Sequence, residues 1–343
     1  MRPPLVPQLF DHRFAEILNE YPLAEQVAPD IRIAVQSGAI ALEAYLRDEL
    51  RDSEHAFLRR SYYAVPLYLQ HLLWEVGDAY ASHPDNYDRL VTEVLRFDRV
   101  VFVTLNYDTI LDRRLELHRP IQGMPDYALD GEHWALIKLH GSINWGQRVD
   151  DDEAELVDYV GIRPRARANQ PRRVETYAQR FAYFGERLPL SATIEFLDGD
   201  DLQGFRAVEV ERAGGYRLGS NLSTYKQLVY PALAAPLGPR DTLVCPESHV
   251  EAVREYQRQS PDGMNLLVIG YSGIDDEVLD LLAWGGRAIR AIKVVNGNHE
   301  YGMAAVRKFA SRFNFEPTDD MAFSGGFTDF AQSDEMAVFL RGL

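Results

Sequence analysis

An amide, a carboxylate and an imidazole follow two apolar runs of the sequence, and such side chains can orient water and transfer a proton. The segment VVFVTLNYDTILDRRLEL (100–117) leads into Asn106 and Asp108, and the apolar run of ALIKLHGSINW (135–145) ends on His140. Histidine changes charge near pH 7 and is the commonest general base, whereas asparagine holds a water or hydroxyl without adding charge. The two segments are therefore candidates for one catalytic site.

Two further apolar runs end in a similar way. In VIGYSG (268–273) the apolar residues are followed by Gly270, Tyr271 and Ser272. In VVNGN (294–298) they are followed by Asn296. In open α/β sheets ligands bind at the carboxyl ends of the strands, where loops and helix N-termini converge. The four ends together predict a cleft for a ligand that contains sugar and phosphate.

Each polar residue also has an ordinary structural explanation. Asp108 precedes a predicted helix and is a natural N-cap, and Asn106 would bond to its own backbone in a turn. Asp275 and Asp276 are common first-turn acids. His140 taken alone would be a satisfied core histidine. These explanations account for single residues but not for their coincidence at four strand ends.

The elements that must position these residues form an alternating pattern of strands and helices. Short continuous apolar runs are typical of parallel strands buried on both faces, and helical periodicity follows two of them, at 109–117 and 275–284. This pattern predicts an α/β fold with a doubly wound, mainly parallel Rossmann-like sheet. The predicted strands are 99–105, 134–139, 265–270 and 291–296.

The segments outside this pattern predict two additions to the sheet domain. Residues 1–98 form an N-terminal helical module, with helices expected at 30–52, 61–81 and 86–97, and residues 99–343 form the Rossmann-like domain. An insertion at about 147–225 has an acidic segment, a basic proline-broken segment and a predicted β-hairpin over 192–219. The arginines of this insertion suit a solvated loop better than a phosphate site. They are Arg163, Arg165, Arg167, Arg172 and Arg173.

Composition excludes several classes of protein. The 343 residues are 46% hydrophobic and 26% charged, as in globular proteins, and the net charge of -16 disfavours binding to nucleic acid or anionic lipid. A single cysteine, Cys245, excludes a disulfide framework and a four-cysteine zinc site, and the histidines show no metal-binding spacing. Because no signal peptide and no run of about 18 apolar residues occurs, we expect a cytoplasmic protein without a metal.

Familiar catalytic motifs do not fit the sequence. GYSGI resembles the nucleophile elbow G-x-S-x-G, but Ile274 replaces the final glycine of that strained turn. The sequence contains neither G-x-x-x-x-G-K-[ST] nor G-x-G-x-x-G, so a phosphate-loop ATPase and an ordinary Rossmann dehydrogenase are both disfavoured.

The ordered motifs resemble the sirtuin-like family, in particular its bacterial branch that hydrolyses NAD in antiphage defence. The matching segments are TLNYD (104–108), KLHGSINW (138–145), VIGYSGIDDEV (268–278) and VVNGN (294–298). The resemblance implies Asn106, His140 and Asp108 as catalytic residues. It implies contacts to NAD, the substrate, from Thr104, Tyr107, Gly141, Ser142, Gly270, Tyr271, Ser272, Asp275 and Asn296.

Two departures from the family keep other functions open. The family's deacylases usually carry a four-cysteine zinc module, which Cys245 alone cannot build, so protein deacylation ranks third. Family members also begin with a strand and a Gly-Ala-Gly turn that approaches the NAD phosphates, whereas this sequence begins with MRPPLVPQLF. Either the start lies further upstream or the first strand is lacking, which leaves a catalytically weak nucleotide-sensing or assembly subunit as the second hypothesis. We further expect a homo-oligomer and a partner subunit or activator.

Overall fold

The computed structural model describes residues 8–36, 45–51, 53–81, 86–129, 131–149, 190–197, 229–233, 243–271, 273 and 275–343. The chain divides into two compact units that interleave along the sequence. Unit 1 comprises Met1–Tyr80, Tyr107–Thr109 and His140–Pro239, and unit 2 comprises Ala81–Asn106, Ile110–Leu139 and Arg240–Leu343. The predicted domains instead follow one another along the chain, with a boundary after residue 98.

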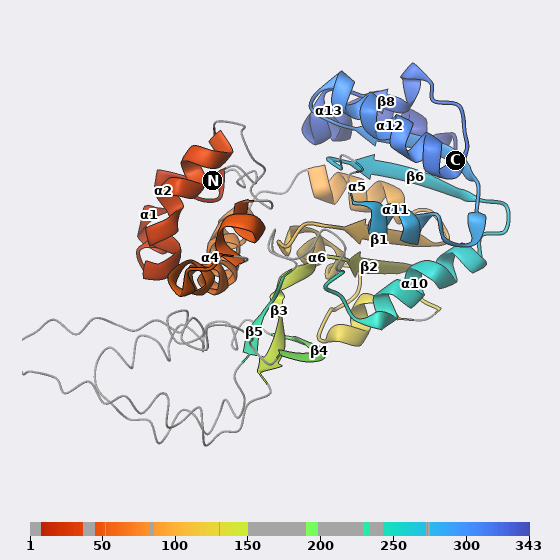
Figure 1. Cartoon of the computed structure of the whole chain (residues 1–343). Helices are drawn as coiled ribbons and strands as arrows, with labels where there is room; N and C mark the ends of the chain where they lie inside the picture. Colours follow the sequence, from red (N-terminus) through yellow and green to blue (C-terminus); the bar gives the residue numbers. More distant parts are fainter. Residues whose placement is uncertain are drawn as a thin grey trace, which may run out of the picture. The chain divides into compact units, whose positions relative to one another are not determined.

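Unit 1 contains the N-terminal helices, of which α1, α2 and α4 are labelled in Figure 1. They are η2 (His12–Phe14), α1 (Ala15–Leu18), α2 (Pro22–Gln36), the π-helical turn η3 (Leu46–Arg51) and α4 (Ala56–Ala81). The helix expected at 61–81 is confirmed within α4, whereas residues 30–36 of the helix expected at 30–52 end α2, and residues 46–51 form the separate turn η3. Their apolar faces form one core, because side chains at helical spacing turn inward together. This core includes Ala24, Val27, Ala28 and Ile31 from α2 and Val65, Tyr68, Leu69 and Leu72 from α4.

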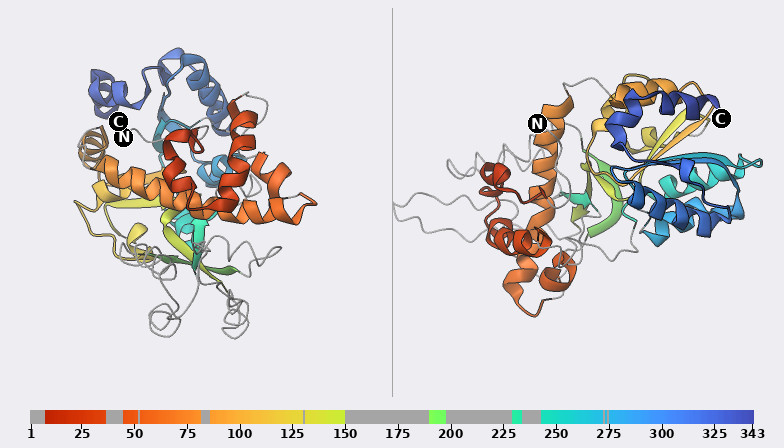
Figure 2. Two further views of the ribbon diagram at one scale, coloured as in Figure 1. Left: turned by 90° about the vertical axis from the view of Figure 1, so that its left-hand side faces the viewer. Right: turned by 90° about the horizontal axis from the view of Figure 1, so that it is seen from above.

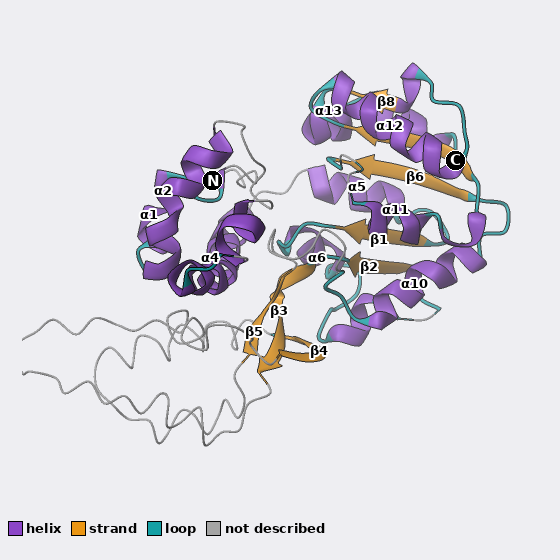
Figure 3. Cartoon of the chain, in the orientation of Figure 1, coloured by secondary structure: helices purple, strands orange, loops and turns teal. Residues whose placement is uncertain are grey.

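Unit 1 also contains a small antiparallel sheet, drawn in orange in Figure 3 as β3, β4 and β5. Its order is β4-β3-β5, with bounds Leu190–Phe196, Gly141–Val149 and Val229–Leu233. Residues 141–146 of β3 are all buried, and among them Ile143 and Trp145 are fully buried. Of the predicted hairpin at 192–219 only residues 192–197 are described, and the five insertion arginines lie outside the described residues.

Unit 2 contains the parallel strands. Strand β1 (Val100–Thr104) pairs with β2 (Trp134–Lys138), and β6 (Met264–Ile269), β7 (Ile289–Val295) and β8 (Ala322–Phe323) form a second parallel sheet in that order. The four predicted strands all appear within two residues of their expected bounds, so the prediction of strands from the apolar runs is confirmed.

Helices cover both faces of the strands in unit 2, as the right-hand view of Figure 2 shows. Val100 and Phe102 of β1 pack with one apolar cluster, whereas Val101 and Val103 pack with another. The first cluster draws on α5 (Asn86–Val94), α13 (Gly326–Gln332) and α14 (Asp334–Arg341), and the second draws on α10 (Glu247–Arg258) and α11 (Asp276–Leu282). A third cluster joins β6 and β7 to α11 and α12 (His299–Phe313).

The outcome is a mixed α/β fold with parallel sheets, consistent with the predicted Rossmann-like class. The helix expected at 86–97 is confirmed as α5, although it packs with unit 2. The short helices α6 (Ile110–Leu115) and η4 (Met124–Tyr127) connect β1 to β2. None of the described helices has both the length and the apolar character that a membrane span requires.

Candidate functional site

The end of β1 presents Asn106 on the surface of unit 2. Its backbone N–H donates to Thr104 Oγ1 at 3.0 Å, and Thr104 O accepts from Leu139 N at 3.1 Å just beyond the end of β2. Asn106 is exposed, and its side-chain amide forms no recorded hydrogen bond with the described residues. The alternative that this amide binds its own turn is therefore not observed. The amide remains available to a water or a hydroxyl.

Within unit 1 the two predicted catalytic segments are hydrogen-bonded to each other. Tyr107 O accepts from Ile143 N at 2.9 Å and from Ser142 Oγ at 3.4 Å. Asp108 and His140 are both half-buried. The unit boundary falls inside both motifs, between Asn106 and Tyr107 and between Leu139 and His140. Unit 1 thus joins Tyr107 of the NYD segment to Ser142 and Ile143 of the HGS segment.

Gly141 has a structural role as the first residue of β3. Its φ is +83°, and a Cβ placed there would overlap the carbonyl oxygen of Ala232 next to β5 partner Leu233. Only glycine satisfies both the backbone conformation and this close approach. Ser142 is fully buried, so its hydroxyl serves the contact with Tyr107 rather than the surface.

Gly270 and Asn296 lie at the ends of adjacent strands in unit 2. Gly270 N donates to Val295 O at 2.9 Å, which continues the β6–β7 ladder by one residue. Asn296 O accepts from Gly326 N at 2.9 Å, so the loop after β8 joins the same edge. Gly270 is exposed with φ of +68°, and a Cβ there would meet nothing within 4 Å. Open space therefore lies above the backbone at this strand end.

The loop after Gly270 is closed by Tyr271. Its hydroxyl donates to Asp275 O at 3.2 Å and accepts from Asp275 N at 3.3 Å, while its ring packs edge-on against Phe309. Burial and then the charge of Asp275 raise the pKa of Tyr271 above its ordinary value. Asp275 precedes α11 but makes no side-chain cap, and Ser272 lies outside the described residues. Tyr271 thus has a structural role, because its hydroxyl bonds to the backbone of Asp275 just before α11.

The side chain of Asn298 caps the N-terminus of α12. Asn298 Oδ1 accepts from Glu300 N at 2.8 Å and Tyr301 N at 3.2 Å, and Asn298 N donates to Asn296 Oδ1 at 3.3 Å. Two of the free N–H groups at this helix start are therefore satisfied internally. This strand end suits hydroxyl groups of a ligand better than a phosphate.

A buried polar cluster in unit 2 was not foreseen from the sequence. Lys138 Nζ lies 3.0 Å from Asp112 Oδ2, and Tyr127 Oη donates to Asp112 Oδ1 at 2.7 Å. The ring of His249 stacks obliquely on that of Tyr127, and its pKa is lowered to about 3 by burial and then by the charge of Lys138. The sequence signal was a lysine inside an otherwise apolar strand, since such a buried charge requires an acid partner.

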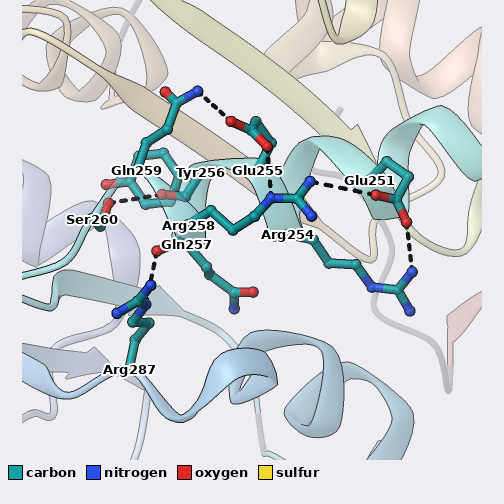
Figure 4. A network of polar contacts seen from close by, with 9 residues as sticks. All are labelled: Glu251, Arg254, Glu255, Tyr256, Gln257, Arg258, Gln259, Ser260 and Arg287. Carbon is teal, nitrogen blue, oxygen red and sulfur yellow. Dashed lines mark hydrogen bonds and ion pairs between the residues drawn. The ribbon is translucent and has the colours of Figure 1, made fainter.

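The polar network on α10 balances its own charges. As Figure 4 shows, Arg254 pairs with Glu251 at 2.6 Å, and Arg258 pairs with Glu255 at 2.7 Å and Glu251 at 3.6 Å. Arg287 Nε donates to the backbone of Gln257 at 3.1 Å. Since each arginine on α10 has a carboxylate partner, this surface offers no strong attraction for an anion.

Neither a metal site nor a reactive thiol appears in the described part of the chain. No group of three or more His, Cys, Asp or Glu side chains is arranged there to hold a metal ion. Burial raises the pKa of the Cys245 thiol to about 12, which disfavours the nucleophilic thiolate. The groups that the described residues offer for chemistry are amides, carboxylates, hydroxyls and imidazoles.

Comparisons with known proteins yield no relative. No protein-family model matches the chain, and neither a curated protein nor a solved structure matches it significantly.

Proposed function

We propose that the protein hydrolyses NAD to nicotinamide and ADP-ribose, in a doubly wound, sirtuin-like domain that acts in antiphage defence. The observation that carries the proposal is the hydrogen-bonded meeting of the NYD and HGS segments, where Tyr107 O accepts from Ser142 and Ile143. The exposed amide of Asn106 at the end of β1 supports it, because hydrolysis requires an oriented water.

His140 is the proposed base. The C1′–N bond to nicotinamide breaks with its electron pair leaving on the nicotinamide nitrogen, and water oxygen forms the new bond to C1′. The proton of that water passes to the neutral imidazole of His140, a role worth roughly 10²- to 10⁴-fold in rate. Because nicotinamide leaves as a neutral molecule, no strong general acid is required. Asn106 orients the water or a ribose hydroxyl. Asp108 is the acidic side chain beside it in the NYD segment.

The adenosine half of NAD is proposed to lie against the ends of β6 and β7. Gly270 offers accessible backbone without a side chain, and Asn296 offers an amide whose Nδ2 donates to no described residue. These groups suit ribose hydroxyls. A homo-oligomer and an activating partner subunit are part of the proposal, since an uncontrolled NAD hydrolase would deplete its own cell.

The test is nicotinamide release from NAD by the full chain, with binding of ADP-ribose measured by calorimetry. We expect His140→Ala and Asn106→Ala to lower release by at least about 100-fold while ADP-ribose still binds. His118→Ala is the matched control, because His118 is exposed and its side chain makes no recorded bond to the described residues. Equal release by parent and variants would refute the site. Tight ADP-ribose binding without release by the parent would favour the nucleotide-sensing subunit, and turnover of an acyl-peptide would favour the deacylase.

A further inference from the structure

A side chain of the N-terminal helices reaches the segment that carries His140. Gln70 on α4 donates from Nε2 to Ile143 O at 2.8 Å, across 73 residues of sequence, and both groups belong to unit 1. The contact is partly buried, and the Ile143 side chain is fully buried.

Ile143 lies in a part of β3 for which the described residues of β4 and β5 provide no register partner. The β3–β5 register shifts between Gly141 and Gly146, and the described β3–β4 pairing begins only at Trp145. A buried backbone group without a partner is costly, so other groups must satisfy the backbone N–H and C=O of Ile143. They are Tyr107, whose carbonyl accepts from Ile143 N at 2.9 Å, and Gln70, which donates to Ile143 O.

Helix α4, the NYD segment and the HGS segment therefore meet at Ile143. Because the described β3–β5 pairing is interrupted after Gly141, contacts from outside the sheet help to fix the residues that follow it. We propose that Gln70 is a positioning residue for His140, so that the N-terminal helices complete the catalytic site rather than merely adjoin it. The catalytic part of this inference rests on the proposed NAD hydrolysis.

The test compares three substitutions of Gln70 in the full chain. Gln70→Met keeps the length but removes the donor, Gln70→Glu sets an acceptor against a carbonyl, and Gln70→Lys restores a donor. We expect kcat for nicotinamide release to fall roughly tenfold in Gln70→Met and further in Gln70→Glu, with KM within about twofold, because a misplaced base slows the chemical step. Gln70→Lys is expected to recover most of the loss. Gln26→Met on α2 is the control, since Gln26 is exposed and has no recorded hydrogen bond within the described chain.

Amide hydrogen exchange over residues 140–146 gives a second measurement that does not depend on activity. Faster exchange in Gln70→Met, reversed in Gln70→Lys, supports the positioning role. Unchanged exchange overturns it, as does an unchanged kcat in an active protein. If exchange quickens in Gln70→Met but the parent neither binds ADP-ribose nor releases nicotinamide, the positioning contact stands and the proposed function fails.

Discussion

Lys138 Nζ and Asp112 Oδ2 lie 3.0 Å apart, with the side chains only 0% and 3% exposed. Lys138 is the last residue of β2, and Asp112 lies on α6, which follows the NYD segment. The pair therefore ties the helix after one predicted catalytic segment to the strand before the other. Tyr127 completes the cluster from η4 by donating to Asp112 Oδ1.

Removing one partner of this pair is expected to be much worse than removing both. Lys138→Met leaves a buried carboxylate and Asp112→Leu leaves a buried ammonium, so each is expected to lower the free energy of unfolding by about 3–5 kcal/mol. The double variant is expected to lose less than either single variant, because no uncompensated charge remains. Urea unfolding of the four proteins measures this coupling. Additive losses would show that the pair does not act as a unit.

An exposed ion pair provides the contrast. Arg254 and Glu251 approach more closely, at 2.6 Å, but their side chains are 35% and 47% exposed. Arg254→Met is therefore expected to cost no more than about 1 kcal/mol, because water and salt screen the pair. The comparison separates the effect of burial from that of distance.

His249 is expected to make stability fall as the pH is lowered. Its folded pKa is about 3, against an ordinary value of 6.5, so between these values the unfolded chain binds a proton that the folded chain excludes. The parent should lose about 1 kcal/mol from this group between pH 7 and 5.5, and no further contribution is expected below about pH 3. His249→Leu should lack this part of the pH dependence, whatever its stability at pH 7. Equal slopes for the two proteins, measured by urea unfolding, would contradict the assignment.

The strands and their polar ends could be predicted from the sequence because each depends on local pattern. Continuous apolar runs identified β1, β2, β6 and β7. Asn106 and Gly270 follow these runs in the sequence and were therefore expected at strand ends. Partners distant in sequence could not be found in this way. Asp112 and Lys138 are 26 residues apart, and Gln70 and Ile143 are 73 apart, so their contacts depend on tertiary packing that no periodicity encodes. Strand β3 was also missed, because its mixture of polar and small residues resembles a loop.

Two glycines with positive φ should respond differently to alanine. Gly141 has φ of +83° and no space, because a Cβ would overlap Ala232 O, whereas Gly270 has φ of +68° and open space. Gly270→Ala is expected to cost about 1–2 kcal/mol of stability from backbone strain alone. Gly141→Ala adds the steric overlap at the β3–β5 edge, so we expect a loss of roughly 3 kcal/mol or more. Thermal unfolding compares the two, and equal losses would show that the close approach does not hold.

Asn298 is expected to stabilise α12 as its N-cap. Its Oδ1 accepts from the backbone of Glu300 and Tyr301, so Asn298→Ala should lower the free energy of unfolding by about 1 kcal/mol. Asn298→Asp should retain the cap, because a carboxylate accepts the same bonds and interacts favourably with the helix dipole. At the other end of α12, Asn314 has φ of 56°, so Asn314→Gly should be nearly neutral. Urea unfolding tests all three; if Asn298→Ala were as stable as the parent, the cap would not contribute to the stability of the helix start.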